Sequence, residues 1–157
     1  MPARATASQV HLATAGIGDV AMDSPTVLCV DDRPELLELR KAVLESNHYC
    51  VKTASSGYSA LKILEETPVS AILLEYRQEG MDAEAVACHI KQQFPDLPII
   101  LLSAFSEIPG RILWLVDEYV MKSELPGGLI RIIERTTHPQ DVALSASQRH
   151  SHSGVAA

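Results

Sequence analysis

The stretch from residue 69 to 82, VSAILLEYRQEGMD, constrains the fold of this chain more than any other segment. The run from Ala71 to Leu74 is apolar without alternation, which is typical of a parallel strand covered on both faces. Glu75 ends the run, Gly80 predicts a turn, and Asp82 predicts the N-cap of a helix. Ligands of open α/β sheets bind beyond the carboxyl ends of such strands, so Glu75 is the first candidate functional residue.

The rest of the chain repeats this strand-then-helix pattern. Further strands are predicted over 26–30, from 48, over 99–102 and over 118–121. Helices are predicted from Pro34, over 57–66, over about 83–94, over 109–115 and over 125–135. The inward stripe of the helix that opens at Pro34 is predicted to contain Leu36, Leu37, Leu39, Val43 and Leu44. Five strands alternating with five helices predict a doubly wound parallel sheet, and right-handed crossovers favour strand order 2-1-3-4-5.

Composition places this sheet in a single domain. The 157 residues suit one domain over 26–135, with a flexible leader over 1–25 and a disordered tail over 136–157. A net charge of −7 argues against direct nucleic-acid binding, which needs a basic face. No apolar run is long enough to cross a membrane. Three cysteines, an odd number placed inside predicted elements, suit a reducing cytoplasm, which is the location we expect.

Strand order 2-1-3-4-5 brings five polar residues to one rim of the sheet. They are Asp31, Asp32, Glu75, Ser103 and Lys122. Three neighbouring carboxylates repel one another and need a cation. Asp32 and Glu75, with the backbone carbonyl of Arg77, would suit Mg²⁺, while Lys122 offers a positive charge to an anion and Ser103 offers a hydroxyl.

Each of these residues also has a purely structural interpretation. Asp32 with Glu35 matches a helix capping box, and Ser103 matches a turn cap. Glu75 and Lys122 match solvated strand ends. The occurrence of all of them at one rim favours a shared site.

Four motifs carry a resemblance to a known family. They are VLCVDD at 27–32, ILLEYRQEGMD at 72–82, PDLPIILLSA at 95–104 and DEYVMK at 117–122. Over residues 26–135 the chain resembles the receiver domains of response regulators in two-component signalling, which have a flavodoxin-like fold.

The resemblance implies a role for each rim residue. It implies that Asp31 and Asp32 bind Mg²⁺, and that the residue at position 75 accepts a phosphoryl group from a sensor histidine kinase. Ser103 and Lys122 would grip that group, and Tyr119 would change rotamer on activation. The face formed by the fourth helix, fifth strand and fifth helix would be the output and homodimer surface.

The acceptor position departs from the family because it holds Glu75 instead of aspartate. Glutamate is longer by one carbon–carbon bond, about 1.5 Å, so its carboxylate reaches toward Ser103 and Lys122. We expect little or no stable phosphorylation, since in-line transfer depends on positioning. Either Glu75 mimics the activated state by accepting hydrogen bonds from Ser103 and Lys122, or the site is silent and the domain serves as a scaffold or adaptor. The retained Asp31, Asp32, Ser103 and Lys122 favour mimicry.

Three further expectations concern other surfaces and activities. Trp114, on a short fourth helix, is predicted to be mostly buried. Arg131 and Arg135 are predicted to pair with Asp117 or Glu118 of a second copy. An enzyme such as a Mg²⁺-dependent phosphatase is disfavoured, because no second acid follows Asp31 or Glu75 at a spacing of two residues. The residues after 135 are too few for a DNA-binding module, so we expect a stand-alone signalling protein whose output passes to another protein.

Overall fold

The computed structural model describes residues 24–78 and 81–138. The main elements are β1 (Thr26–Val30), α1 (Pro34–Glu45), β2 (Cys50–Ala54), α2 (Gly57–Glu66), β3 (Ala71–Glu75), α3 (Ala83–Gln93), β6 (Ile99–Ser103), α4 (Gly110–Leu113), β7 (Glu118–Met121) and α5 (Gly127–Thr137). Three short pieces complete the list: β4 (Arg77–Gln78), β5 (Met81–Asp82) and the 3₁₀ turn η1 (Lys122–Glu124). The antiparallel β4–β5 pair was not predicted, because two-residue strands leave no periodic signal.

The five long strands form one parallel sheet in the order β2-β1-β3-β6-β7, as the alternation of strands and helices predicted. In this register Val30 of β1 lies beside Leu74 of β3. The residues that follow, Asp31 and Glu75, therefore lie at the same end of neighbouring strands. The β1/β3 boundary is the switch point at which the strand order reverses.

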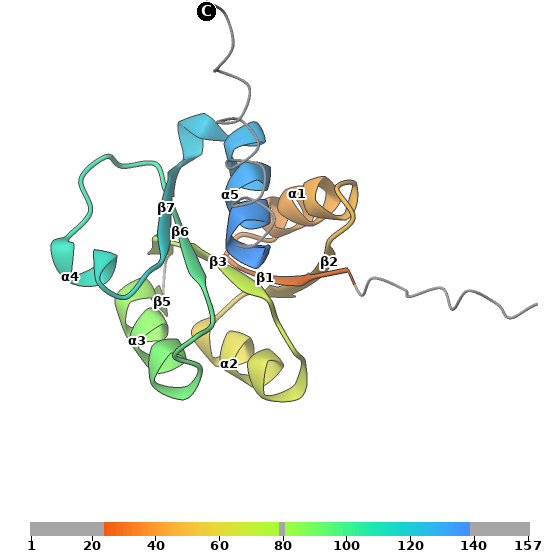
Figure 1. Ribbon diagram of the computed structural model, residues 1–157. Coiled ribbons are helices and arrows are strands. Elements are labelled where there is room, and N and C mark those ends of the chain that lie inside the picture. The colour runs from red at the N-terminus through yellow and green to blue at the C-terminus, as the bar shows by residue number, and fades with distance from the viewer. Residues whose placement is uncertain (1–23, 79–80, 139–157) are drawn as a thin grey trace, which may run out of the picture.

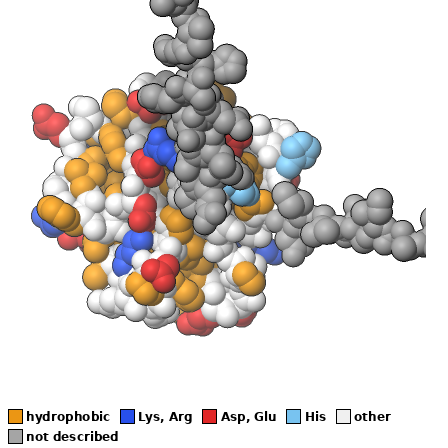
Figure 2. Space-filling view, viewed as in Figure 1, with side chains coloured by type: hydrophobic (Ala, Val, Ile, Leu, Met, Phe, Trp, Pro, Cys, Tyr) orange, Lys and Arg blue, Asp and Glu red, His pale blue; other side chains and the backbone are white. Residues whose placement is uncertain are grey.

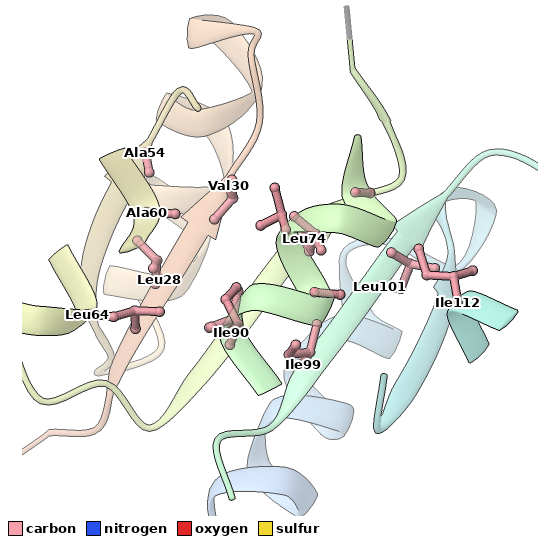
Figure 3. Close-up of a cluster of buried hydrophobic side chains, with 14 residues drawn as sticks. Leu28, Val30, Ala54, Ala60, Leu64, Leu74, Ile90, Ile99, Leu101 and Ile112 are labelled. Carbon is pink, nitrogen blue, oxygen red and sulfur yellow. The ribbon is translucent and has the colours of Figure 1, made fainter. Parts of the chain in front are cut away.

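Helices cover both faces of this sheet (Figure 1). α1 and α5 lie on one face, while α2 and α3 lie on the other. Apolar strand residues alternate between the two cores, so Leu28 and Ile72 contribute to one core and Cys29 and Leu73 to the other. Figure 3 shows the first core, which combines strand residues such as Leu101 with helix residues such as Ile90 and Ile112.

Helix α1 differs from prediction in the side chains that it buries. Leu37 and Leu44 are buried as expected, but the third buried side chain is Arg40, and Leu39 is 61% exposed. Including Leu39 in the inward stripe was therefore wrong. Leu37 and Leu44 are seven residues apart and define one face, on which position 40 falls and position 39 does not. A charged side chain thus occupies a core position of this helix.

The N-termini of α1 and α3 test two predicted helix caps. The N-cap of α1 is Arg33 without a side-chain cap, and Pro34 is the first helical residue, so the proposed capping box of Asp32 and Glu35 is wrong. At α3 the expected cap is confirmed, because Asp82 accepts hydrogen bonds from the backbone N–H groups of Glu84 and Ala85.

The predicted burial of Trp114 is wrong. Trp114 is 90% exposed, because the four-residue helix α4 is too short to cover it. Within the chain, Arg135 donates to Glu118 at 2.6 Å and Lys91 donates to Asp117 at 2.7 Å, whereas contacts of these residues with a second copy stay a prediction.

The cysteines are free thiols, of which Cys29 is buried, Cys88 is partly buried and Cys50 is exposed.

Some predictions fall outside the described residues. These are the leader up to residue 23, the turn at Gly80 and the tail from residue 139, although α5 extends two residues beyond the expected domain end at 135. Within the described ranges, none of the helices has both the length and the apolar character needed to traverse a bilayer.

Candidate functional site

Two carboxylates are buried where β1 and β3 end. Asp31 is fully buried and follows β1, where its backbone N–H donates to the carbonyl of Ala54. Glu75 is the last residue of β3 and is 2% exposed. Burying two carboxylates costs several kcal/mol per ion unless positive partners and hydrogen bonds are supplied.

Arg40 supplies a partner to both carboxylates. Its Nη1 donates to Asp31 Oδ2 at 2.7 Å, and its Nη2 donates to Glu75 Oε2 at 3.1 Å. The planar guanidinium presents two N–H donors in a fixed fork, which suits one donor to each acid. The prediction that this cluster needs a cation is met by a residue that the sequence reasoning missed. The signal was available: an arginine on the helical face defined by Leu37 and Leu44.

Lys122 provides the second cation. Its Nζ lies 2.7 Å from Glu75 Oε2, the oxygen that also accepts from Arg40. The lysine side chain is partly buried, so water screens this pair less than a surface ion pair. The expected approach of Glu75 to Lys122 is thus present in the geometry.

Ser103 makes a different contact from the one that the mimicry hypothesis gave it. Its buried Oγ accepts the backbone N–H of Phe105 at 3.0 Å, and among the contacts described for Ser103 none is to Glu75. The Tyr119 hydroxyl donates to the backbone carbonyl of Phe105. Tyr119 and Ser103 therefore both hold the loop that follows β6.

Phe105 also receives a contact from the β3 side. The Arg77 guanidinium lies 4.3 Å from the centre of the Phe105 ring, a cation–π contact. Sequence reasoning named Arg77 only for its backbone carbonyl and did not name Phe105. The loop after β3 and the loop after β6 are thus connected above the buried acids.

These loops border a surface hollow of about 710 Å³. It is lined by Asp32, Arg33, Glu75, Arg77, Ala104, Phe105 and Lys122. The hollow therefore contains every predicted metal or anion residue except Asp31 and Ser103, which lie buried beneath the rim.

The donor set does not fit the Mg²⁺ that the resemblance implies. Asp31 Oδ1 accepts the Arg33 backbone N–H at 3.0 Å, and its Oδ2 accepts Arg40. Within residues 24–78 and 81–138 no group of three or more His, Cys, Asp or Glu side chains is arranged to hold a metal ion. Mg²⁺ binds through carboxylate oxygens and retained waters, whereas here a guanidinium bridges two of the three acids.

Cys29 lies two residues before Asp31 and belongs to the same buried region. Burial raises the pKa of its thiol to about 12; the positive charge of Arg40 opposes this rise, and the charge of Asp31 adds to it. The thiol is therefore neutral and contributes no charge to the cluster.

Comparison with known proteins agrees with this fold. Residues 27–134 match the model of the response regulator receiver domain. The chain is 32% identical to the response regulator TrrA of Thermotoga maritima, whose structure in complex with Mg²⁺–BeF superposes with a TM-score of 0.67, covering 71% of this chain and 98% of TrrA. The chain thus belongs to the response regulator receiver domain family, whose domains act in two-component signalling.

Longer relatives contain this domain as one part. The transcriptional regulatory protein GlrR of Escherichia coli K12 is 35% identical over 86 residues, 55% of this chain and 19% of GlrR. PrrA of Mycobacterium leprae is 32% identical over 107 residues, 66% of this chain and 46% of PrrA. The chain therefore spans about a fifth to a half of the length of these relatives.

Proposed function

We propose that this chain is a receiver-type signalling module that acts by binding another protein without accepting a phosphoryl group. The 2.7 Å contact between Lys122 and Glu75 carries the proposal. Through this contact the glutamate carboxylate meets the lysine that would otherwise pair with a phosphoryl group in the family. A carboxylate has one charge and two oxygens, against nearly two charges and three oxygens for phosphate, so the mimicry is partial.

The surroundings of Glu75 also oppose its use as an acceptor. A nucleophilic oxygen must be positioned in line with the leaving group. Glu75 is nearly fully buried, and its Oε2 is contacted by both Arg40 and Lys122. A γ-glutamyl phosphate would in addition be open to attack by its own backbone nitrogen, which closes a five-membered ring.

The partner that we propose is a sensor histidine kinase or another signalling protein. TrrA, 32% identical to this chain, has been crystallised with the histidine kinase ThkA. The charge of the chain does not favour nucleic acid: the formal net charge is −7, and on the face shown in Figure 2 the visible Lys and Arg lie among Asp and Glu. Direct DNA binding, as in a transcriptional regulator, is therefore not part of the proposal.

A silent scaffold is the competing proposal, and the loop contacts support a signalling role over it. Ser103 and Tyr119 both bind Phe105, and Arg77, two residues after Glu75, packs on its ring. The proposed route from Glu75 to the exposed surface after β6 therefore runs along the backbone to Arg77 and from its guanidinium to the Phe105 ring. In a silent site the charge of residue 75 would not influence that surface.

Two measurements test the proposal. Intact mass after incubation with acetyl phosphate and Mg²⁺ is expected to show no added phosphoryl group on the native protein. Partners recovered in an interaction screen with the native chain are expected to bind Glu75→Gln at least tenfold more weakly and Glu65→Gln, a change at an exposed acid on α2, equally well. A phosphorylated native protein, or equal binding of all three proteins, would contradict it.

A further inference from the structure

We infer that the guanidinium of Arg40 is a permanent internal cation that replaces the divalent metal ion at this receiver site. The inference goes beyond the proposed function and does not depend on it. It concerns what neutralises the acids, whether or not Glu75 signals.

The first support is the geometry of the bridge. One guanidinium joins two acids that are 35 and nine residues away in sequence, Glu75 at 3.1 Å and Asp31 at 2.7 Å. All three side chains are at most 7% exposed. The contacts are thus charge-assisted hydrogen bonds in a region of low dielectric, where they are strong.

The second support is the way the helix delivers Arg40. Its position on α1 lies between Leu37 and Leu44, whose packing in the core fixes the helix against the sheet. An arginine at such a position is costly unless its charge is compensated. The two acids at the ends of β1 and β3 provide that compensation, so helix packing and ion pairing fix the same position.

The third support is electrostatic exclusion. A divalent ion bound by Asp31 and Glu75 would have to approach the carboxylates that Arg40 contacts, and two like charges at short range repel. Both oxygens of Asp31 already accept a hydrogen bond, Oδ1 from the Arg33 backbone N–H and Oδ2 from Arg40. Because Arg40 is a covalent part of the chain, this cation cannot be removed by dilution or chelation.

The experiment compares divalent-ion binding by Arg40→Gln with binding by the native protein. Glutamine removes the charge and keeps polar atoms near the acids. Mn²⁺ is the probe, because it takes the oxygen ligands that suit Mg²⁺ and broadens nearby amide NMR signals. Arg40→Lys keeps the charge, and Arg131→Gln removes the same charge from an exposed site on α5.

The expected result is that Arg40→Gln binds Mn²⁺ at least about tenfold more tightly than the other three proteins, or ~1.4 kcal/mol. The amides around Asp31 and Glu75 should broaden only in this variant. Equal Mn²⁺ affinity of the native protein and Arg40→Gln would overturn the inference, as would broadening at these amides in the native protein.

Folding of the variant provides a second readout. Arg40→Gln leaves two buried carboxylates without their bridging partner, so it is expected to be less stable. If it is unfolded in chelator, refolding on addition of Mg²⁺ supports the inference, and failure to refold at saturating Mg²⁺ overturns it. The melting temperature of the native protein should be the same in Mg²⁺ and in chelator, and a rise with Mg²⁺ would count against the inference.

Discussion

At the scale of single residues, the proposed loss of phosphoryl acceptance depends on one methylene group and one arginine. The longer side chain brings Glu75 into contact with Lys122, and Arg40 joins the same oxygen. Two cationic partners stabilise the ionised form of a buried carboxylate. If the negative charge of that carboxylate is removed, both cations are left without their anion, which costs stability.

Glu75→Gln is therefore expected to lower the free energy of unfolding by about 3 kcal/mol, because Arg40 and Lys122 keep their charges but lose the shared anion. Urea unfolding measures the change. Glu107→Gln removes an exposed acid and should stay within about 0.5 kcal/mol of the native protein. A Glu75→Gln value as small as that of the control would show that the ion pairs contribute nothing to stability.

The thiol of Cys29 gives a second residue-scale prediction. Burial raises its pKa from 9.0 to about 12, so it remains protonated and should not react with a thiol reagent at neutral pH, whereas exposed Cys50 should react rapidly. Because the folded-state pKa is the higher one, Cys29 contributes stability that is complete below pH 9.0 and is lost as the pH rises toward about 12. Peptide mapping of the labelled thiols checks the reactivity. Fast labelling of Cys29 in folded protein would refute its burial.

At the scale of elements, most of the fold was predictable because buried strands and short helices leave strong patterns. The bounds of α2, 57–66, and of the strand 118–121 were predicted as they occur, and the strand order followed from the handedness of crossovers. The two-residue strands β4 and β5 were missed because they are too short to show periodicity.

Helix α1 shows why burial was harder to predict than helix position. The apolar pattern identified the helix, but Leu39, which was predicted to face inward, is exposed, and Arg40 is buried. Sequence favours the leucine for the core. Arg40 is buried instead because it pairs with Asp31 and Glu75. These acids lie at the ends of β1 and β3, so the pairing becomes visible only in the tertiary structure.

The short helix α4 gives a prediction for the exposed surface. Trp114 is 90% exposed beside Leu113, which is 43% exposed, so their apolar area is available to a partner. Trp114→Ala should leave the free energy of unfolding within about 0.5 kcal/mol, since few packing contacts are lost. The same change should weaken binding of partners recovered with the native chain. Tyr58→Ala, which removes another exposed aromatic on α2, is the matched control. A large loss of stability with Trp114→Ala would show that this side chain is part of the core.

At the scale of the whole molecule, the rim of the site was predictable but its charge balance was not. The strand ends determine that Asp31, Glu75, Ser103 and Lys122 converge, and the topology determines which of them are neighbours. The identity of the cation depends on a helix packed against the sheet from one side. Strand-end motifs contain no information about that helix, so the sequence reasoning assigned the position to a metal ion.

The last prediction concerns how the two departures combine. Glu75→Asp shortens the acceptor by about 1.5 Å and frees it from Lys122, but Arg40 still bridges the acids. Arg40→Gln removes the bridge but leaves the long acceptor. Phosphoryl transfer depends on positioning and on a metal that neutralises the developing charge, so each single change leaves one requirement unmet.

Only Glu75→Asp combined with Arg40→Gln is expected to gain the mass of one phosphoryl group from acetyl phosphate with Mg²⁺. No gain is expected in chelator, and Glu75→Asp combined with Arg131→Gln should show none in either condition. Phosphorylation of Glu75→Asp alone would show that Arg40 does not keep the metal out, and this outcome separates the role of Arg40 from that of Glu75.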